Sequence, residues 1–204
     1  MTSHRPATVT LHWIPLGAGG AVVPRCGRFY EAVRARREHR PSQRLVHAAL
    51  SIDDGDRRYV VEQAPAWDTR APERGVTVTG PVGAAWLGRC RYFRYEIRCW
   101  PGGTIPDLDF ALVSSPIPSD PDRIRRLLDL TRSVPAHTWG RDEIGAHDMW
   151  NSNSVIAWLL TRSGHDTTLI APPDGCRAPG WTAGSWAATS PDEGPQPGWR
   201  APQP

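Results

Sequence analysis

Residues 44–63, RLVHAALSIDDGDRRYVVEQ, carry the clearest structural signal in the chain. The apolar and β-branched residues of RLVHAALSI predict a strand from Arg44 to Ile52, and RYVVEQ predicts a second strand from Arg58 to Gln63. DDGD lies between them and has the composition of a turn. The two strands are therefore expected to pair as an antiparallel β-hairpin.

Three further segments extend this hairpin into a sheet. Residues 7–15 (ATVTLHWIP) and 76–82 are rich in β-branched residues and predict short strands. Residues 91–100 (RYFRYEIRCW) alternate, and one face of the predicted strand carries Phe93, Tyr95, Ile97 and Cys99. This alternation is typical of an antiparallel strand that is buried on one face only.

Residues 27–38 (GRFYEAVRARRE) predict a short amphipathic helix with Phe29, Ala32 and Val33 facing the core. Its other side and the residues after it form a basic cluster, which consists of Arg34, Arg36, Arg37, Arg40 and Arg44. A solvated helix face is the ordinary explanation for such a cluster, and nucleic-acid binding is the alternative.

Two more helices are predicted from their end signals. Asp120 at the N-cap and Pro121 at the first helical position predict a helix that ends near residue 132. A second helix is predicted from Asn151 to just before Gly164, which suits the position after the C-cap. Together with the strands, these helices predict an α+β fold with an antiparallel sheet.

The length of the chain predicts one domain. It has 204 residues with 19 glycines and 21 prolines, which favours short strands and many loops over a helical bundle. The composition predicts a single α+β domain over residues 1–171, a Gly/Pro-rich segment over 172–187 that lies on the domain surface, and a disordered tail over 188–204.

Several classes of protein are not favoured by the sequence. No apolar run approaches the roughly 18 residues of a membrane span, and no basic start followed by an apolar stretch resembles a secretory signal, so we expect a cytoplasmic protein. The net charge of +3 is too small to call for a nucleic-acid partner. The cysteines show neither CxxC nor zinc-like spacing, and LGAGG (16–20) lacks a nucleotide-loop pattern, so we expect no metal and no cofactor.

Three polar residues form the candidate catalytic site. His47 lies within an apolar strand, Glu62 lies near the end of the partner strand, and Ser152 lies in the first turn of an apolar helix. If that helix packs against the hairpin, Ser152 is placed as a nucleophile, His47 as its base and Glu62 as the group that orients the imidazole. The backbone N–H groups at the helix start are expected to form the oxyanion hole.

The same segments resemble a known family. HAALSIDDGDRRYVVEQAP (47–65) is similar to the His-bearing hairpin of the permuted papain-like superfamily, and WNSNSVIAWLL (150–160) is similar to its second motif, an Asn-Cys segment that opens a helix. The superfamily includes lecithin retinol acyltransferase-like and desumoylase-like proteins. The resemblance implies a circularly permuted papain-like fold in which His47 matches the base, Glu62 the orienting residue and Ser152 the nucleophilic cysteine.

The match departs from the family at the nucleophile, which is Ser152 rather than cysteine. A hydroxyl forms its anion far less readily than a thiol does, so two functions stay open. One is a hydrolase or acyltransferase that acts on an amide, ester or thioester in a small-molecule, peptide or acyl substrate. The other is a catalytically silent binding or scaffolding domain of the same fold. Ser154 is a second candidate nucleophile if the register differs by two residues.

Overall fold

The hairpin predicted around DDGD lies at the centre of the sheet in the computed structural model, which describes residues 7–18, 22–67 and 75–190. Strands β2 and β3 pair antiparallel, with Leu50 opposite Val61 and Ile52 opposite Tyr59. The described strands are β1 (Thr8–Pro15), β2 (Arg44–Asp53), β3 (Arg58–Pro65), β4 (Val76–Pro81), β5 (Arg94–Pro101), β6 (Val113–Ile117) and β7 (Cys176–Arg177).

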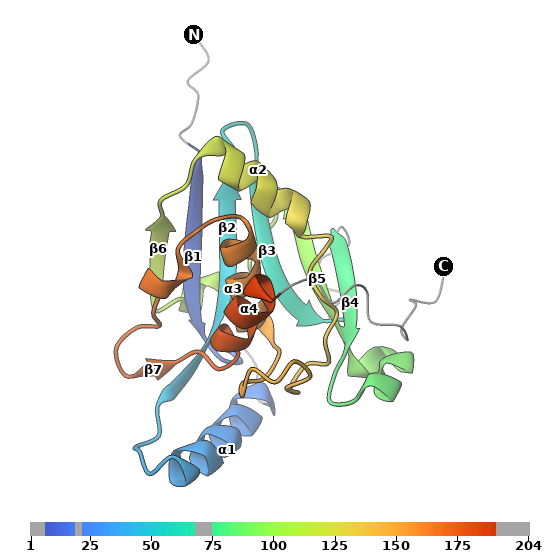
Figure 1. Ribbon diagram of the computed structural model, residues 1–204, viewed down its shortest axis with the longest axis vertical. Coiled ribbons are helices and arrows are strands. Elements are labelled where there is room, and N and C mark those ends of the chain that lie inside the picture. The colour runs from blue at the N-terminus through green and yellow to red at the C-terminus, as the bar shows by residue number, and fades with distance from the viewer. Residues whose placement is uncertain (1–6, 19–21, 68–74, 191–204) are drawn as a thin grey trace.

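The strand order is β4-β5-β3-β2-β1-β6, and each neighbouring pair in this path is antiparallel (Figure 1). The short strand β7 pairs in parallel with the start of β2. The described helices are α1 (Val22–Arg37), α2 (Pro121–Leu130), α3 (Ser152–Arg162) and α4 (Trp181–Thr189). The predicted α+β class with an antiparallel sheet is thus confirmed.

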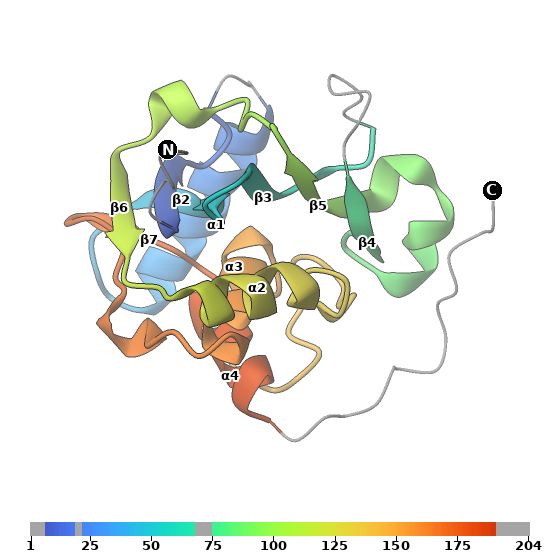
Figure 2. The ribbon, with the colours of Figure 1, turned by 90° about the horizontal axis from the view of Figure 1, so that it is seen from above.

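The main core lies between the sheet and the helices α2, α3 and α4, which gather on one side of it (Figure 2). On this side, Leu11 of β1 and Leu50 of β2 belong to the same buried cluster as Ile156 and Leu159 of α3. Burial of such side chains stabilises a fold by about 1.5–3 kcal/mol each. Helix α3 therefore packs on the sheet at β2, one of the two hairpin strands that it was expected to contact.

The opposite face of the sheet carries a second, smaller core. Ile14 of β1, Ala49 of β2 and Val60 of β3 are buried there against Ile105, which lies between β5 and β6. Because side chains alternate along a strand, these residues and the main core divide each central strand into two faces. This division decides which groups meet at the candidate site.

Strand β5 is buried on both faces at its centre, which corrects the predicted half-buried strand. Tyr95 and Ile97 face the main core as expected, but Glu96 and Arg98 are buried as well. Arg98 Nη2 lies 2.9 Å from a carboxylate oxygen of Glu96, and this ion pair makes the burial of two charges tolerable. Phe93 is exposed, because residues 91–93 form a 3₁₀ turn before β5 begins.

Helix α1 is longer than predicted and buries a different face. It begins at Val22, with Pro24 in its first turn, where a missing N–H costs no helical hydrogen bond. Phe29 is 74 % exposed and Ala32 is exposed, whereas Glu31 and Ala35 are buried. The prediction failed here because hydrogen bonds to Glu31 allow a carboxylate to take an inward position.

The predictions for α2 and α3 are confirmed. The side chain of Asp120 accepts a hydrogen bond from the Arg123 backbone N–H, and Pro121 is the first residue of α2. Asn151 caps α3, and Gly164 follows its end with a positive φ of 91°. Strand β6, which contains Pro116 and forms one edge of the sheet, was not predicted. Proline is common on edge strands because it offers no N–H to a further strand.

Residues 172–190 form part of the domain, whereas the sequence placed 172–187 on its surface. They supply β7 and α4, and Ala183 and Gly184 of α4 are buried. The expected tail lies largely outside the described residues, which end at Ser190. Among the described residues, no helix is long and apolar enough to cross a membrane.

Candidate functional site

The site predicted from the sequence is built around the start of α3. Asn151 is the N-cap, and its Oδ1 accepts hydrogen bonds from the backbone N–H groups of Asn153 (2.8 Å) and Ser154 (3.4 Å). Ser154 Oγ in turn accepts a bond from the Asn151 N–H (3.0 Å), which completes a capping box. Two of the backbone amides that were expected to contribute to an oxyanion hole are therefore already bonded.

Asn153 and Ser154 tie α3 to its surroundings. Asn153 Nδ2 donates to the carbonyl oxygens of Val46 in β2 (3.0 Å) and Pro179 before α4 (2.8 Å). The buried hydroxyl of Ser154 lies 2.8 Å from the Gly180 carbonyl and donates to it. Ser154 is thus bound into the framework, which removes it as an alternative nucleophile.

Ser152 is the first residue of α3 and is half-buried. It is the one hydroxyl of the WNSNS segment that is bonded to no described residue. Its position at a helix N-terminus is the one that the sequence predicted.

His47 lies on the other face of the sheet. Its cross-strand partner is Ile14, and both Ile14 and Ala49 belong to the smaller core. The neighbours of His47 in β2, Val46 and Ala48, point instead into the main core with α3. Burial lowers the pKa of His47 to about 4, so the imidazole is neutral at pH 7.

Glu62 shares the face of His47 but has an ion-pair partner of its own. Val60, two residues away in β3, lies in the smaller core, so Glu62 points to the same side. Arg98 stands opposite Glu62 in β5, and the Arg98 Nη1 to Glu62 Oε1 distance is 3.4 Å. The carboxylate that was expected to orient an imidazole is bound to a guanidinium.

The structure therefore does not assemble the predicted trio. No hydrogen bond or ion pair joins Ser152, His47 and Glu62 to one another in the described part of the chain. His47 and Glu62 lie on the face opposite to the one that α3 covers. Side chains alternate with a period of two along a strand, so the spacing of His47 and Glu62 was predictable, but the face of the sheet that α3 covers was not.

A different histidine is engaged with serines, and the sequence did not single it out. His12 is buried in β1, its Nδ1 lies 2.8 Å from Ser114 Oγ and its Nε2 lies 2.9 Å from Ser51 Oγ. Arg58 also donates to Ser51 (3.3 Å). Both ring nitrogens of His12 are thus bonded to serine hydroxyls, and the tautomer of the ring decides which serine donates and which accepts.

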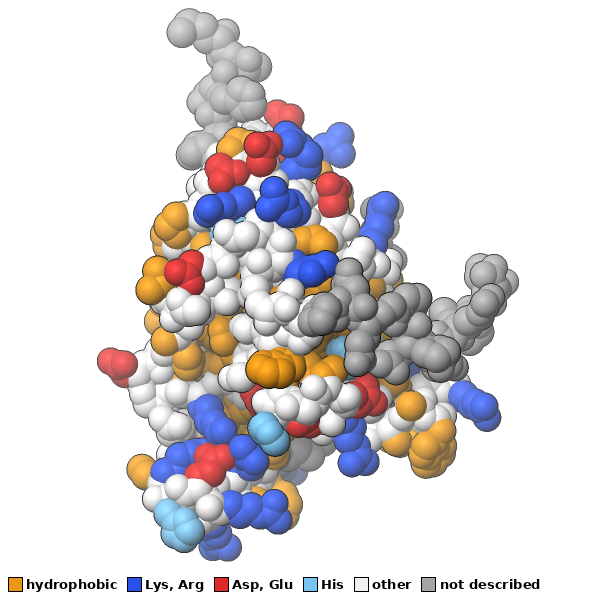
Figure 3. Space-filling model, viewed as in Figure 1, with side chains coloured by type: hydrophobic (Ala, Val, Ile, Leu, Met, Phe, Trp, Pro, Cys, Tyr) orange, Lys and Arg blue, Asp and Glu red, His pale blue; other side chains and the backbone are white. Residues whose placement is uncertain are grey.

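The basic cluster divides into paired and unpaired residues. Arg34 and Arg40 form ion pairs with Glu38, and Arg40 also pairs with Glu31. The side chains of Arg36, Arg37 and Arg44 are exposed and form no hydrogen bond or ion pair with a described residue. Figure 3 shows arginine side chains around α1 mixed with acidic and histidine side chains, so this end of the molecule is not uniformly basic.

Neither a group of metal ligands in the described residues nor a match to a known protein points to a function. In residues 7–18, 22–67 and 75–190, no group of three His, Cys, Asp or Glu side chains is placed to hold a metal ion. No family model, no curated protein and no solved structure matches the chain. The function is therefore inferred from the geometry of these residues.

Proposed function

We propose that this chain is a catalytically silent binding domain. The observation that carries the proposal is the state of the α3 N-terminus, where Asn151 already holds the amides of Asn153 and Ser154. Stabilising an oxyanion requires donors that are free to bind it, and this is usually the largest contribution to acyl transfer. N–H donors that are bonded within the protein stabilise the helix start instead of binding an oxyanion.

The positions of the other two residues support the same conclusion. A serine hydroxyl needs a base within hydrogen-bond distance to act as a nucleophile at neutral pH. His47 lies on the face of the sheet opposite to α3, and Glu62 is paired with Arg98. In the WNSNS segment, Asn153 joins α3 to β2 and Ser154 joins it to Gly180 at the start of α4. These bonds give the segment a structural role.

A serine hydrolase or acyltransferase is the second candidate. It is favoured by Ser152, which lies half-buried at the start of α3 with a hydroxyl not bound to any described residue, and by the neutral state of His47 at pH 7. For this candidate, the first part of β2 would have to move so that the imidazole reaches the hydroxyl.

Covalent labelling separates the two candidates. We expect a fluorophosphonate probe to leave the folded wild-type protein unlabelled. Labelling that disappears in Ser152→Ala but persists in Ser154→Ala would establish the hydrolase and overturn the proposal.

A cysteine at position 152 gives a second, independent measurement. The variant Ser152→Cys is made together with Cys90→Ser, because Cys90 is an exposed thiol, and Cys90→Ser alone is the control. We expect the new thiol to react with iodoacetamide as an ordinary cysteine, without the lowered pKa that a nearby imidazolium confers. Hydrolysis of a thioester by this variant, abolished by His47→Gln, would contradict the proposal.

A further inference from the structure

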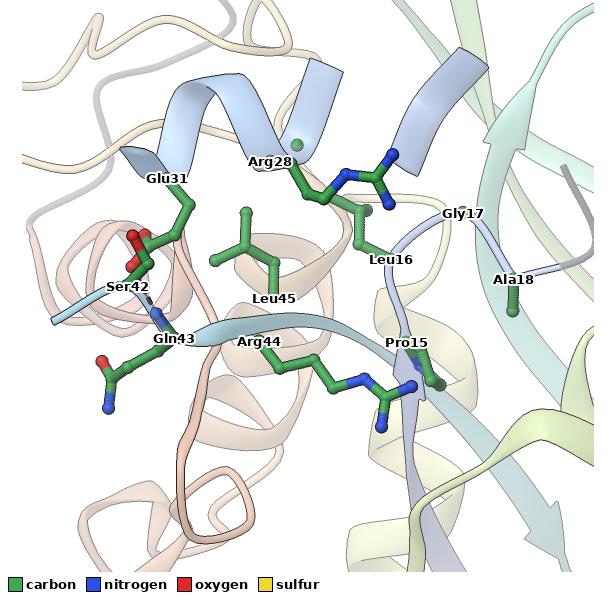
Figure 4. Close-up of a pocket in the computed structure, with 11 residues that line it drawn as sticks. Pro15, Leu16, Gly17, Ala18, Arg28, Glu31, Ser42, Gln43, Arg44 and Leu45 are labelled. Atoms are coloured by element: carbon green, nitrogen blue, oxygen red, sulfur yellow. Dashed lines mark hydrogen bonds between the residues drawn. The ribbon is translucent and has the colours of Figure 1, made fainter. Parts of the chain in front are cut away.

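A pocket of about 600 Å³ lies between α1, the end of β1 and the start of β2 (Figure 4). Residues 15–18 and 42–45 form two of its sides, and Gly27, Arg28 and Glu31 of α1 form the third. Its volume is within the range of small-molecule sites. None of these residues belongs to the site predicted from the sequence.

The middle of the pocket is apolar and held in place by the backbone. Leu16 and Leu45 lie side by side, since the Leu16 N–H donates to the Leu45 carbonyl (3.0 Å). Helix α1 approaches them through Gly27, where a Cβ atom would lie 2.8 Å from Leu16 Cδ2. An apolar group can bind against this surface without displacing a polar side chain.

One end of the pocket is acidic, but its charge is neutralised within the protein. Glu31 is only 2 % exposed, and it accepts hydrogen bonds from Arg40 and from the Gln43 N–H (2.9 Å). Burial alone would raise the pKa of Glu31, but these hydrogen bonds and the nearby Arg177 outweigh it and lower the pKa. Glu31 thus stays ionised and paired.

The other end carries two guanidinium groups without such partners. Figure 4 shows the side chain of Arg28 extending beside Leu16 and that of Arg44 extending beside Pro15, apart from each other and both away from Glu31. Neither guanidinium group forms a hydrogen bond or ion pair with any residue that the structure describes. The pocket is therefore apolar in the middle and cationic at one end.

We propose that this pocket binds a carboxylate attached to an apolar group. The planar guanidinium fork of arginine matches a carboxylate, and Leu16 and Leu45 offer contact for the apolar part. The same guanidinium forks bind phosphate, but a phosphate gains further stabilisation where free backbone N–H groups contact it. Here the amides of Leu16, Gln43 and Arg44 are already bonded within the protein.

This inference rests on the proposed binding function and gives it a site and a ligand class. The carboxylate has two possible sources, a small acyl acid and the C-terminus of a peptide that ends in an apolar residue. Both present the same chemistry to Arg28 and Arg44, so the experiment includes an arm for each.

Calorimetric titration of the full chain with octanoate tests the site, with octan-1-ol and acetate as probes that each lack one half of the ligand. We expect octanoate to bind more tightly than either. Arg28→Gln and Arg44→Gln should each weaken octanoate binding by about tenfold or more, since a charge-assisted pair is lost. Arg36→Gln is the matched control, because Arg36 is an exposed, unpaired residue of α1 that does not line the pocket.

The peptide arm compares a short peptide ending in leucine with its C-terminal amide. Binding of the free acid alone, lost in Arg28→Gln, assigns the site to peptide C-termini. Absence of binding by both octanoate and peptide, or equal weakening in Arg36→Gln, overturns the inference. The fluorophosphonate measurement does not depend on this pocket, so failure of the site is distinguishable from failure of the proposed function.

Discussion

Asn151 uses both ends of its side-chain amide. Its oxygen caps α3, and its Nδ2 donates to the Pro179 carbonyl (2.8 Å) in the segment that precedes α4. Because the residue is buried, water cannot replace these bonds when they are removed. The side chain thus holds a helix start and a distant segment together.

Asn151→Ala is therefore expected to cost more than the usual loss of a cap. We expect a fall of about 2–3 kcal/mol in the free energy of unfolding, from the lost cap and the buried groups left unpaired. Asp120→Ala, at the exposed cap of α2, is the control and should cost about 1 kcal/mol or less. Urea unfolding measures both, and equal losses would contradict the role assigned to Asn151.

His47 gives a pH-dependent signature. Its folded pKa of about 4 lies below the unfolded value, so the unfolded chain binds a proton below about pH 6.5 while the folded imidazole stays neutral. Stability is therefore lost as the pH falls from 6.5 towards 4, by up to about 1.4 kcal/mol per pH unit. His47→Gln should lose less between pH 7 and pH 5 than the wild type, as measured by unfolding at each pH. Parallel losses in the two proteins would show that His47 does not titrate this way.

At the scale of elements, α3 and α4 touch through their backbones. A Cβ atom on Gly184 of α4 would lie 2.1 Å from the Ser154 carbonyl oxygen of α3. This close approach brings Gly180 within reach of Ser154 Oγ, and it requires a residue without a side chain. The α3–α4 contact therefore requires glycine at position 184.

Gly184→Ala is expected to destabilise the protein by about 2 kcal/mol or more, because the two helices must separate. In an exposed helix the same change would stabilise it, so the sign of the effect identifies the contact. Thr182→Ala on the exposed side of α4 is the control and should stay within about 0.5 kcal/mol. A stabilised Gly184→Ala protein, detected by thermal unfolding, would contradict the packing.

Elements with local signals were predictable, and those that depend on tertiary contacts were not. Asp120 and Pro121 mark the start of α2 by their own chemistry, and DDGD marks the central turn. The buried face of α1 depends on Arg40 and Gln43, which bond to Glu31 from outside the helix. The candidate site follows the same rule. Ser152 was correctly placed at a helix start by local signals, but whether α3 covers the sheet face that carries His47 depends on tertiary packing.

At the scale of the whole molecule, residues 172–190 complete the domain. Strand β7 pairs in parallel with the start of β2. The Gly180 N–H donates to Oδ2 of Asp148, which lies just before α3 (2.7 Å). Three side chains at the start of α3 bond to the carbonyls of Pro179 and Gly180. The segment that the composition suggested was peripheral thus supports the helix that carries Ser152.

A chain that ends at residue 171 is therefore expected to lose cooperative unfolding, since it lacks these bonds and the α4 contact. A chain that ends at residue 190 keeps every described contact of α4 and is the control. Near-UV circular dichroism and urea unfolding follow the tertiary packing of both. A cooperative transition in the shorter chain would show that the first 171 residues are a domain by themselves.

The edge strand β6 has a consequence for how copies of this chain meet. The N–H and C=O groups along an open sheet edge can recruit a strand from another molecule, which leads to open-ended aggregation. Pro116 lies in β6, where it removes one donor from the ladder that such a strand would need. Its ring thus protects the fold against cross-molecular strand addition along β6.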